Sequence, residues 1–308
     1  MPAFINKDVN LRQTDWLGSP ALGAILVTAI WGFNMVAMKA VLTDMDPLLF
    51  TSARFLLLAI VLVPFVKIST KQLRPLLPIA LVMGLGHFYL LAVGLSIVPG
   101  VVASVCFLLA APFSALLSYL FLSERITPIQ SLAIITATLG AMLPTLLTGE
   151  SDLQWGMLIV ILSTFMWAIG NIQIRKLKEL SVLSVQFWIA IITAPLCFGA
   201  YLLQANNTPI LPQFTTSTIL TLMYVALCSS ILSYSLWYGL VHRHGMSRLA
   251  GFILLQPIFT LIFGYLILGE SLSFWQLVGS SITLAGVYTY FKQNKADKPT
   301  AESVLQKQ

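Results

Sequence analysis

Charged residues are scarce in this sequence. They make up 9% of its 308 residues, against roughly a quarter in a typical soluble domain. Hydrophobic residues make up 58%, so the composition indicates an integral membrane protein. At about 20 apolar residues per crossing, the stretch 20–291 has room for roughly ten helices and leaves almost nothing for a soluble domain.

Cysteine is also rare, and its placement is uninformative for cofactor chemistry. The three cysteines, Cys106, Cys197 and Cys228, lie scattered within apolar runs, where a thiol behaves as a small hydrophobe. An odd, dispersed set argues against a disulfide framework, and the scattered cysteines and histidines argue against a zinc site. We therefore expect neither a metal nor a cofactor.

Motifs of ATP-driven and enzymatic proteins are missing. The sequence contains no G-x-x-x-x-G-K-[ST] phosphate loop, no H-E-x-x-H and no G-x-S-x-G, so an ATP-driven pump and an intramembrane enzyme are both disfavoured. No acidic residue falls in the middle of an apolar run either. A transporter, a channel, and a membrane receptor or scaffold remain as function classes.

The apolar runs themselves predict an all-α protein with ten membrane-spanning helices. Charged or turn-like breaks delimit spans near 20–42, 47–68, 74–96, 99–123, 127–148, 155–176, 182–203, 215–240, 247–269 and 273–291. Residues 1–19 lack the apolar core of a signal peptide, so we expect a retained cytoplasmic tail there and a second cytoplasmic tail over 292–308.

The basic residues predict the orientation of these spans. With the N-terminus inside, 15 of the 17 Lys and Arg fall on the cytoplasmic side and none in an outside loop, while Lys39 and Arg54 lie within spans. Such an excess is the strongest orientation signal in a sequence. It predicts that both termini are cytoplasmic, and it explains the net charge of +6 through topology and not through nucleic-acid binding.

An internal repeat divides the ten spans into two halves. The segment Tyr119–Glu124 reappears as Tyr265–Glu270, and the helix that precedes each of these glutamates carries a mid-span proline, Pro112 or Pro257. At the same offset, Gln130 matches Gln276 and Gly140 matches Gly286. Five helices in each half is an odd number, so the second half enters the membrane from the opposite side. Inverted repeats of this kind surround a midplane site that is exposed alternately to the two faces.

Several short motifs, in order, carry a family resemblance. They are Ile30-Trp31-Gly32-Phe33-Asn34 with Lys39, Pro47-Leu48-Leu49 with Arg54-Phe55, Ser123-Glu124-Arg125, and Trp167-Ala168-Ile169-Gly170-Asn171. From Leu22 to Tyr290 the chain resembles the drug/metabolite transporter superfamily, specifically its EamA-type exporters, and among these the exporters of O-acetylserine and cysteine. The resemblance implies one EamA repeat over 20–148 and a second over 155–291, around a central cavity.

The same resemblance implies a function. It suggests a monomer in the bacterial cytoplasmic membrane that exports a small metabolite, such as an amino acid or a derivative of one. The sequence departs from the pattern of the O-acetylserine and cysteine exporters at Leu109 and Ala111, where glutamines are expected. This more apolar wall makes a larger substrate, such as an aromatic amino acid, competitive with cysteine-like ones. Multidrug or purine-type export and facilitative exchange stay open.

Two basic residues lie within spans, where charge is costly and normally faces protein or a water-filled cavity. Arg54 lies about two turns into the second span, so it could attract a substrate carboxylate or tie helices together. Lys39 lies near the outer end of the first span, where its long side chain can reach the interface. Asp44 and Asp46 are its expected local partners.

Four repeat-related residues near mid-span, Trp31, Asn34, Trp167 and Asn171, are candidates for contact with the substrate. The asparagines could instead bridge packed helices, and the tryptophans, which lie too deep for an interfacial aromatic belt, could pack in the core. All four stay open between these two roles.

The remaining candidates come from the third, fourth, eighth and ninth spans. His87 could carry protons in a coupled cycle or pack through a hydrogen bond. Tyr234 is a better cavity candidate than Trp237, which is expected near the interface. Gln256 precedes Pro257, and Pro112 and Pro257 each free a backbone carbonyl, which makes these positions candidate site walls or kinks. Glu124 and Glu270 are expected to mark turns at helix ends.

Overall fold

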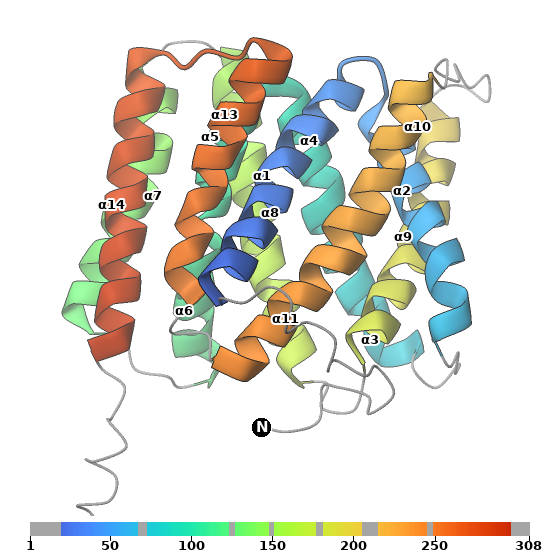
Figure 1. Cartoon of the computed structure of the whole chain (residues 1–308), viewed down its shortest axis with the longest axis horizontal. Helices are drawn as coiled ribbons and strands as arrows, with labels where there is room; N and C mark the ends of the chain where they lie inside the picture. Colours follow the sequence, from blue (N-terminus) through green and yellow to red (C-terminus); the bar gives the residue numbers. More distant parts are fainter. Residues whose placement is uncertain are drawn as a thin grey trace, which may run out of the picture.

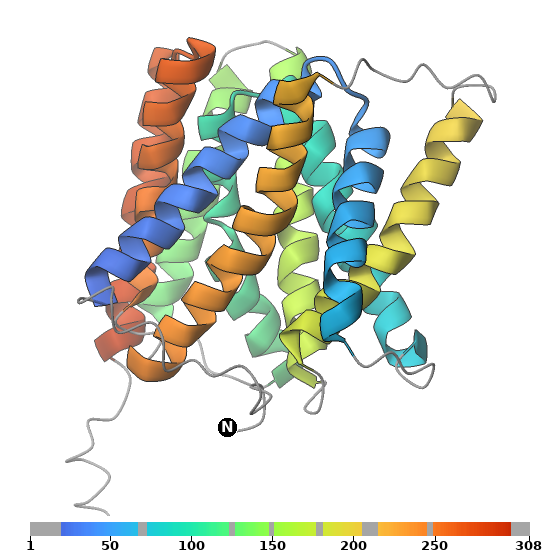
Figure 2. The same cartoon turned by 45° about the vertical axis from the view of Figure 1, so that its right-hand side comes forward.

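The structure, a computed structural model, describes residues 20–66, 73–122, 127–147, 151–176, 181–204, 215–244 and 249–296. Within these ranges the regular structure is entirely helical, and the helices run side by side as one bundle (Figures 1 and 2). Seven of the described helices are long and apolar enough to cross a membrane, and two shorter apolar helices accompany them.

The helical segments assemble into ten crossings, as predicted, and each predicted span overlaps one of them. The crossings are α1 (Pro20–Leu42); α2 (Pro47–Leu62) with η2 (Val63–Phe65); α3 (Leu73–Ala80), η4 (Leu81–Tyr89) and α4 (Leu90–Ile97); α5 (Gly100–Phe107) and α6 (Ala110–Leu122); α7 (Pro128–Leu147); α8 (Ser151–Lys176); α9 (Val182–Gln204); α10 (Thr216–Met223), η5 (Tyr224–Leu232) and α11 (Ser233–His244); η6 (Ala250–Leu255) and α13 (Gln256–Leu268); and α14 (Phe274–Ala296).

Helix α1 begins and α14 ends on the same side of the bundle, which we call the terminal face; the opposite side is the distal face (Figure 1). Both expected tails, apart from the last turn of α14, lie outside the described residues, as does Glu124. The cytoplasmic location of the terminal face stays a prediction.

The helix contacts follow the inverted repeat. Helix α1 packs against α13 as α8 packs against α6, and α1 packs against α11 and η5 as α8 packs against α4 and η4. Helix α2 packs against α9, which is the equivalent helix of the other half, and α7 packs against its own equivalent, α14. The third and eighth crossings each contain a π-helical stretch, η4 and η5 respectively. The predicted fold of two inverted five-helix halves is confirmed.

The repeated glutamines have a structural explanation at the starts of α7 and α14. The backbone N–H of Thr127 donates to Gln130 Oε1 at 2.9 Å, and that of Ser273 donates to Gln276 Oε1 at 2.9 Å. In return, the hydroxyl of Thr127 or Ser273 accepts from the backbone N–H of its glutamine. This reciprocal arrangement is a capping box, so each glutamine fixes the start of a helix.

The fourth and ninth crossings are interrupted just before their prolines. Helix α5 stops at Phe107, a turn at Leu108 and Leu109 follows, and α6 starts two residues before Pro112. In the ninth crossing the 3₁₀ helix η6 gives way to α13 one residue before Pro257. Because proline lacks a backbone donor and crowds the preceding turn, regular α-helix does not continue through either point.

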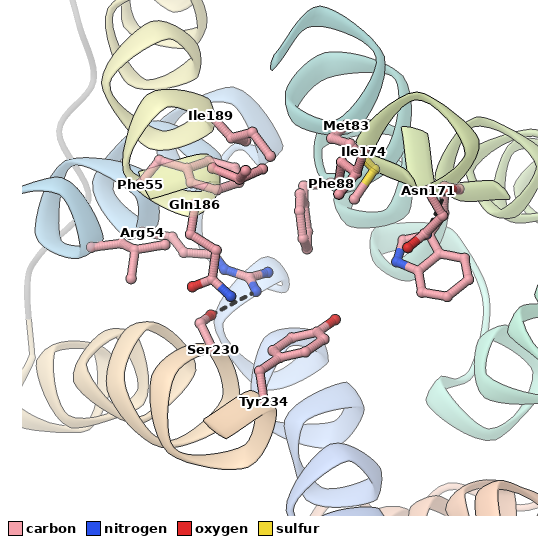
Figure 3. A pocket seen from close by; sticks show the side chains of 13 residues that line it. Arg54, Phe55, Met83, Phe88, Asn171, Ile174, Gln186, Ile189, Ser230 and Tyr234 are labelled. Atoms are coloured by element: carbon pink, nitrogen blue, oxygen red, sulfur yellow. Dashed lines mark hydrogen bonds between the residues drawn. The ribbon is translucent and has the colours of Figure 1, made fainter. Parts of the chain in front are cut away.

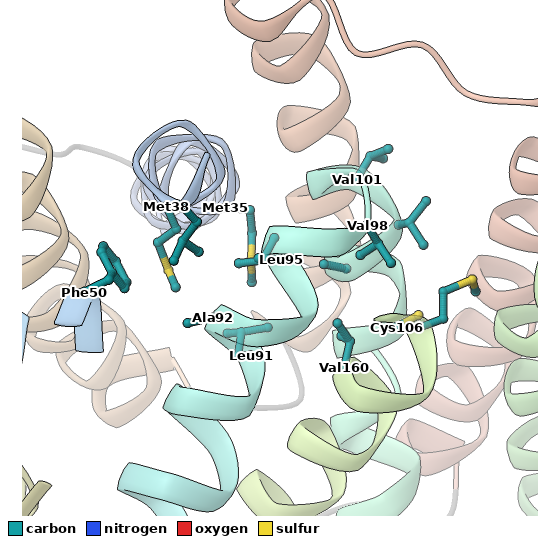
Figure 4. Packing of buried hydrophobic residues seen from close by; sticks show 14 of the residues in the cluster. Met35, Met38, Phe50, Leu91, Ala92, Leu95, Val98, Val101, Cys106 and Val160 are labelled. Carbon is teal, nitrogen blue, oxygen red and sulfur yellow. The ribbon is translucent and has the colours of Figure 1, made fainter. Parts of the chain in front are cut away.

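The largest cluster of buried hydrophobic side chains fills the distal half of the bundle. It joins α1, α4, α5 and α8 through residues such as Met38, Leu95, Val101 and Val160 (Figure 4). Leu109 is fully buried in this cluster. The expectation that Leu109 forms a cavity wall is therefore wrong, because the turn before α6 directs its side chain into the core.

Candidate functional site

A cavity of about 360 Å³ lies between the two halves. Its lining contains all eight residues predicted from the sequence to contact substrate: Trp31, Asn34, Arg54, His87, Trp167, Asn171, Tyr234 and Gln256. A smaller cavity of about 100 Å³ adjoins it and shares several lining residues, Arg54 and Tyr234 among them (Figure 3). The larger cavity has the size of a small-molecule site. That the eight residues contact substrate stays a prediction.

The two cavities extend from mid-bundle toward the terminal face. Trp237 and Phe291, which line the larger cavity, lie near the ends of α11 and α14 at that face. Ile174 and Val185, which line the smaller one, lie near the terminal-face ends of α8 and α9. Since the distal half is filled by the hydrophobic cluster, the site in this conformation is closed toward the distal face.

Arg54 is the only charged residue among the described side chains that line the two cavities. Its side chain is 4% exposed. The Nη2 atom donates to Ser230 Oγ at 3.2 Å, Nη1 lies 3.7 Å from Met38 Sδ, and the guanidinium lies 4.7 Å from the Phe88 ring centroid. The Nε atom has no hydrogen-bond partner. A buried guanidinium with spare donors and no lining carboxylate is suited to bind an anionic group.

Ser230 is held by the irregular helix that carries it. Its hydroxyl donates to the carbonyl of Val225, five residues earlier, at 2.9 Å, which leaves its oxygen free to accept from Arg54. Figure 3 shows the labelled Arg54, Gln186, Ser230 and Tyr234 directed into the same space. The π-helical stretches η4 and η5 thus place His87 and Ser230 at the cavity, in line with the frequent occurrence of π-bulges at functional sites.

Lys39 does not interact with the aspartates expected to be its partners. Its Nζ donates to the Ser96 carbonyl at 3.2 Å and interacts electrostatically with Glu270. Asp46 instead caps α2 by accepting from the backbone N–H of Leu48 at 2.7 Å. The expectation was wrong because helix packing brings the end of α13 to Lys39, and sequence proximity does not reveal this. Lys39 lies outside the cavity lining.

The tryptophans form an aromatic wall together with Tyr234. The ring centroid of Trp31 lies 5.5 Å from that of Tyr234 and 5.4 Å from that of Trp237. The Trp31 indole N–H donates to Ser233 Oγ at 2.8 Å, which fixes the ring against the eighth crossing. Trp237 is 6% exposed and lines the cavity. Trp237 therefore lines the cavity together with Tyr234, and its expected place near the interface stays a prediction.

Neither candidate asparagine bridges two helices through the contacts of its described side chain. Asn34 Nδ2 donates to Met38 Sδ at 3.4 Å, and Asn171 Nδ2 donates to the Trp167 carbonyl at 2.8 Å, both within their own helices. Asn34 Oδ1 is buried and has no hydrogen-bond partner. The cavity wall therefore contains an unused acceptor on α1.

His87 joins the third and sixth crossings. Its Nδ1 lies 3.1 Å from the Ser163 carbonyl oxygen, so Nδ1 carries the hydrogen and Nε2 of the neutral ring is an acceptor. The ring stacks on Phe107 at a centroid distance of 5.6 Å. The contact to Ser163 has the geometry of a helix-bridging hydrogen bond, so the packing role of His87 has a specific partner.

Gln256 lies where α1 comes closest to α13. Gln256 is 2% exposed, and its backbone carbonyl accepts from the Thr260 hydroxyl at 2.9 Å. Gly32 makes the close approach possible, because a Cβ atom there would lie 2.6 Å from Phe259 Cβ. The motif that suggested the family thus has a packing function as well as a position beside the cavity.

Other lining residues are not identifiable from the sequence. They include Met35, Phe107, Leu108, Ser114 and Phe291. Most are apolar residues in helices that are apolar all round, and no periodic pattern separates a cavity-facing residue from a lipid-facing one. The helix break before Pro112 is the one available signal, since it marks where the wall containing Leu108 and Ser114 turns toward the cavity.

Comparison with known proteins identifies the family. The EamA-like transporter family matches the chain twice, over residues 18–146 and 154–291. A Salmonella typhimurium (strain LT2) protein named "Probable amino-acid metabolite efflux pump" is 32% identical over 275 residues, covering 86% of this chain and 92% of that protein. An Escherichia coli (strain K12) protein of the same name is 30% identical with the same coverage.

A solved crystal structure with 14% identity covers 88% of this chain and 97% of its own, with a TM-score of 0.59. This likeness supports the fold alone. The two family matches coincide with the two structural halves on either side of the cavity. The chain is therefore a multi-pass membrane transporter and belongs to the EamA-like transporter family.

Proposed function

We propose that this transporter exports an amino acid or an amino-acid derivative across the bacterial cytoplasmic membrane, with the substrate carboxylate bound by Arg54. The observation that carries the proposal is the buried Arg54 guanidinium, whose Nε lacks a partner and which faces a cavity without a described lining carboxylate. The names of the two relatives support amino-acid metabolites as the substrate class.

A ligand screen followed by flux measurement tests this proposal. Purified protein would be heated with amino acids and their derivatives, with purines, and with cationic drugs, and compounds that raise Tm would then be tested for efflux from proteoliposomes. We expect stabilisation and flux with carboxylates, because a bound ligand raises Tm by mass action. Stabilisation by cationic drugs or purines without any carboxylate response would contradict the proposal and favour the multidrug or purine alternative.

Alternating access in this protein requires the distal face to open, and a cluster of polar contacts closes it here. Both oxygens of the Glu270 carboxylate accept from the Gly100 backbone N–H at 3.0 Å. Gly264 permits this approach, since a Cβ there would lie 2.9 Å from Glu270 Oε2. With the bond from Lys39 to Ser96, these contacts join α1, α4, α5 and α13. We infer that the cluster stabilises the state that is closed at the distal face.

Glu270→Gln is expected to make the distal half open more often. The amide retains one acceptor but loses the charge that faces Lys39 and the start of α5. Cys106, which is 1% exposed and follows Gly100 along α5, serves as a native reporter. We expect its maleimide labelling, followed by peptide mass spectrometry, to rise several-fold. Asp152→Asn, an exposed acid-to-amide change at the distal end of α8, should leave the labelling of Cys106 unchanged. Equal labelling in Glu270→Gln and wild type would refute the gating role.

His87→Gln distinguishes a helix bridge from a proton carrier. If the hydrogen bond to Ser163 is its main role, the variant should lose roughly 1–3 kcal/mol of stability, the cost of an unsatisfied buried acceptor, while the pH dependence of efflux keeps its shape. Proteoliposome efflux measured between pH 5.5 and 8.5, with Tm recorded in parallel, checks both. A flattened pH profile with unchanged Tm would instead show that His87 carries protons.

A further inference from the structure

Arg54 and Asn34 form one recognition unit through Met38. Arg54 Nη1 lies 3.7 Å from the Met38 sulfur, and Asn34 Nδ2 lies 3.4 Å from the same atom. These two distances place the guanidinium and the amide nitrogen no more than about 7 Å apart. That spacing matches two neighbouring functional groups of a small ligand, each at hydrogen-bond distance from one of the two side chains.

The two side chains offer opposite hydrogen-bonding capacity. Arg54 has an unused donor at Nε, and Asn34 has an unused acceptor at Oδ1. Both residues line the cavity and both are more than nine-tenths buried. An unpaired buried acceptor is costly, and the terminal amide torsion is soft, so Oδ1 can rotate onto a ligand donor. The unit therefore fits a carboxylate with a hydrogen-bond donor on the adjacent carbon.

The donor on the adjacent carbon could be a charged ammonium group or a neutral hydroxyl group, and the cavity favours the neutral one. An α-ammonium group would need a carboxylate to compensate its burial, yet no aspartate or glutamate is among the described residues lining either cavity. An α-hydroxyl group gives Asn34 the same hydrogen bond without carrying a charge into the site. The carboxylate of such a ligand neutralises Arg54 and gives its Nε a partner, and the hydroxyl gives Asn34 Oδ1 a partner.

The rest of the cavity indicates the ligand's side chain. Aromatic rings of Trp31, Phe88, Phe107, Trp167 and Trp237 form much of the lining. Ring–ring contacts with an aromatic ligand would add to the apolar area buried. The geometry, the charge and the lining thus converge on one chemical class.

We propose that the cavity binds aromatic 2-hydroxy carboxylates at least as tightly as the corresponding 2-amino acids, with Asn34 accepting from the 2-hydroxyl. This rests on the proposed function, because it assumes that Arg54 binds the carboxylate. It goes further in assigning Asn34 as the residue that determines specificity at carbon 2.

Three ligands that differ only at carbon 2 test the assignment: L-3-phenyllactate, L-phenylalanine and 3-phenylpropionate. Binding to the purified full chain would be followed by quenching of tryptophan fluorescence, since Trp31, Trp167 and Trp237 line the cavity. We expect phenyllactate to bind at least as tightly as phenylalanine and about 10-fold more tightly than phenylpropionate, which lacks the donor. In Asn34→Leu the preference for phenyllactate over phenylpropionate should fall to within about 2-fold.

Thr28→Val is the matched control on the same helix. Thr28 is fully buried, bonds only to carbonyls of α1 and lies outside the cavity lining, so its variant should keep the 10-fold preference. Phenylalanine binding more tightly than phenyllactate would overturn the proposal without any variant. An unchanged preference in folded Asn34→Leu would also overturn it.

These binding measurements distinguish a failure of the aromatic 2-hydroxy proposal from a failure of the proposed function. If none of the three ligands binds while other amino-acid metabolites do, the aromatic 2-hydroxy class is wrong and the proposed function stands. If all three bind equally well to Arg54→Gln and to wild type, the carboxylate role of Arg54 is wrong, and the proposed function falls with it.

Discussion

Replacing Arg54 with glutamine is expected to weaken substrate binding roughly 100-fold, from the loss of about 3 kcal/mol of charge-assisted hydrogen bonding. Folding should survive, because the guanidinium forms no ion pair with a described residue. Its hydrogen bond to Ser230 and its contact with the Phe88 ring are small compensation for burying a charge. We therefore expect Tm to stay constant or rise while transport falls.

Opposite effects on transport and stability make this experiment decisive. Efflux from proteoliposomes and thermal unfolding would be measured on the same preparation, with Arg54→Lys as a variant that keeps the charge but loses the planar fork. Arg74→Gln, the same change at an exposed position at the start of α3, should alter neither quantity. Full transport by a folded Arg54→Gln protein would exclude Arg54 from substrate recognition.

The fold could be predicted from the sequence because the bilayer imposes simple rules on it. Each crossing needs a long apolar stretch with its backbone hydrogen bonds satisfied internally, so breaks such as those after Leu42 and Ile97 are visible in the sequence. The repeat was visible for a local reason: Gln130 and Gln276 each cap a helix in the same way. Such residues keep their position whatever the surrounding helices do.

The lining of the candidate site could be predicted only for its polar residues and for the repeat-related tryptophans. Arg54, Asn34 and His87 are noticeable because polar side chains in hydrocarbon require a partner or a cavity. The apolar wall formed by Leu108 and Phe107 carries no such mark. The partner of Lys39 could not be predicted either, because its neighbour Glu270 is brought close only when the ninth crossing packs beside the first. The limit in both cases is tertiary packing, which local spacing does not encode.

The contact between α7 and α14 should be highly sensitive to added volume. A Cβ atom on Gly140 would lie 2.6 Å from the Thr283 backbone nitrogen, and one on Gly286 would lie 2.6 Å from the Ala137 backbone nitrogen. Thr283 also donates through its hydroxyl to the Ala137 carbonyl at 3.3 Å. Because the obstacle is backbone, a side-chain rotation cannot relieve it. Small residues that let helix backbones approach closely are a main source of helix association in membranes.

Gly140→Ala and Gly286→Ala are each expected to destabilise the protein by about 1–3 kcal/mol through overpacking, measured as a lower Tm of the purified chain. The double variant should lose less than the sum, since one substitution already separates the helix pair that the other would push apart. Gly199→Ala on α9 is the matched control, because a Cβ there meets nothing within 4 Å, and its Tm should hold or rise with the better helix propensity of alanine. Equal Tm values for Gly140→Ala and Gly199→Ala would show that the α7–α14 contact adjusts freely. In that case the matching glycines would not be required for the close approach of the two halves at this pair.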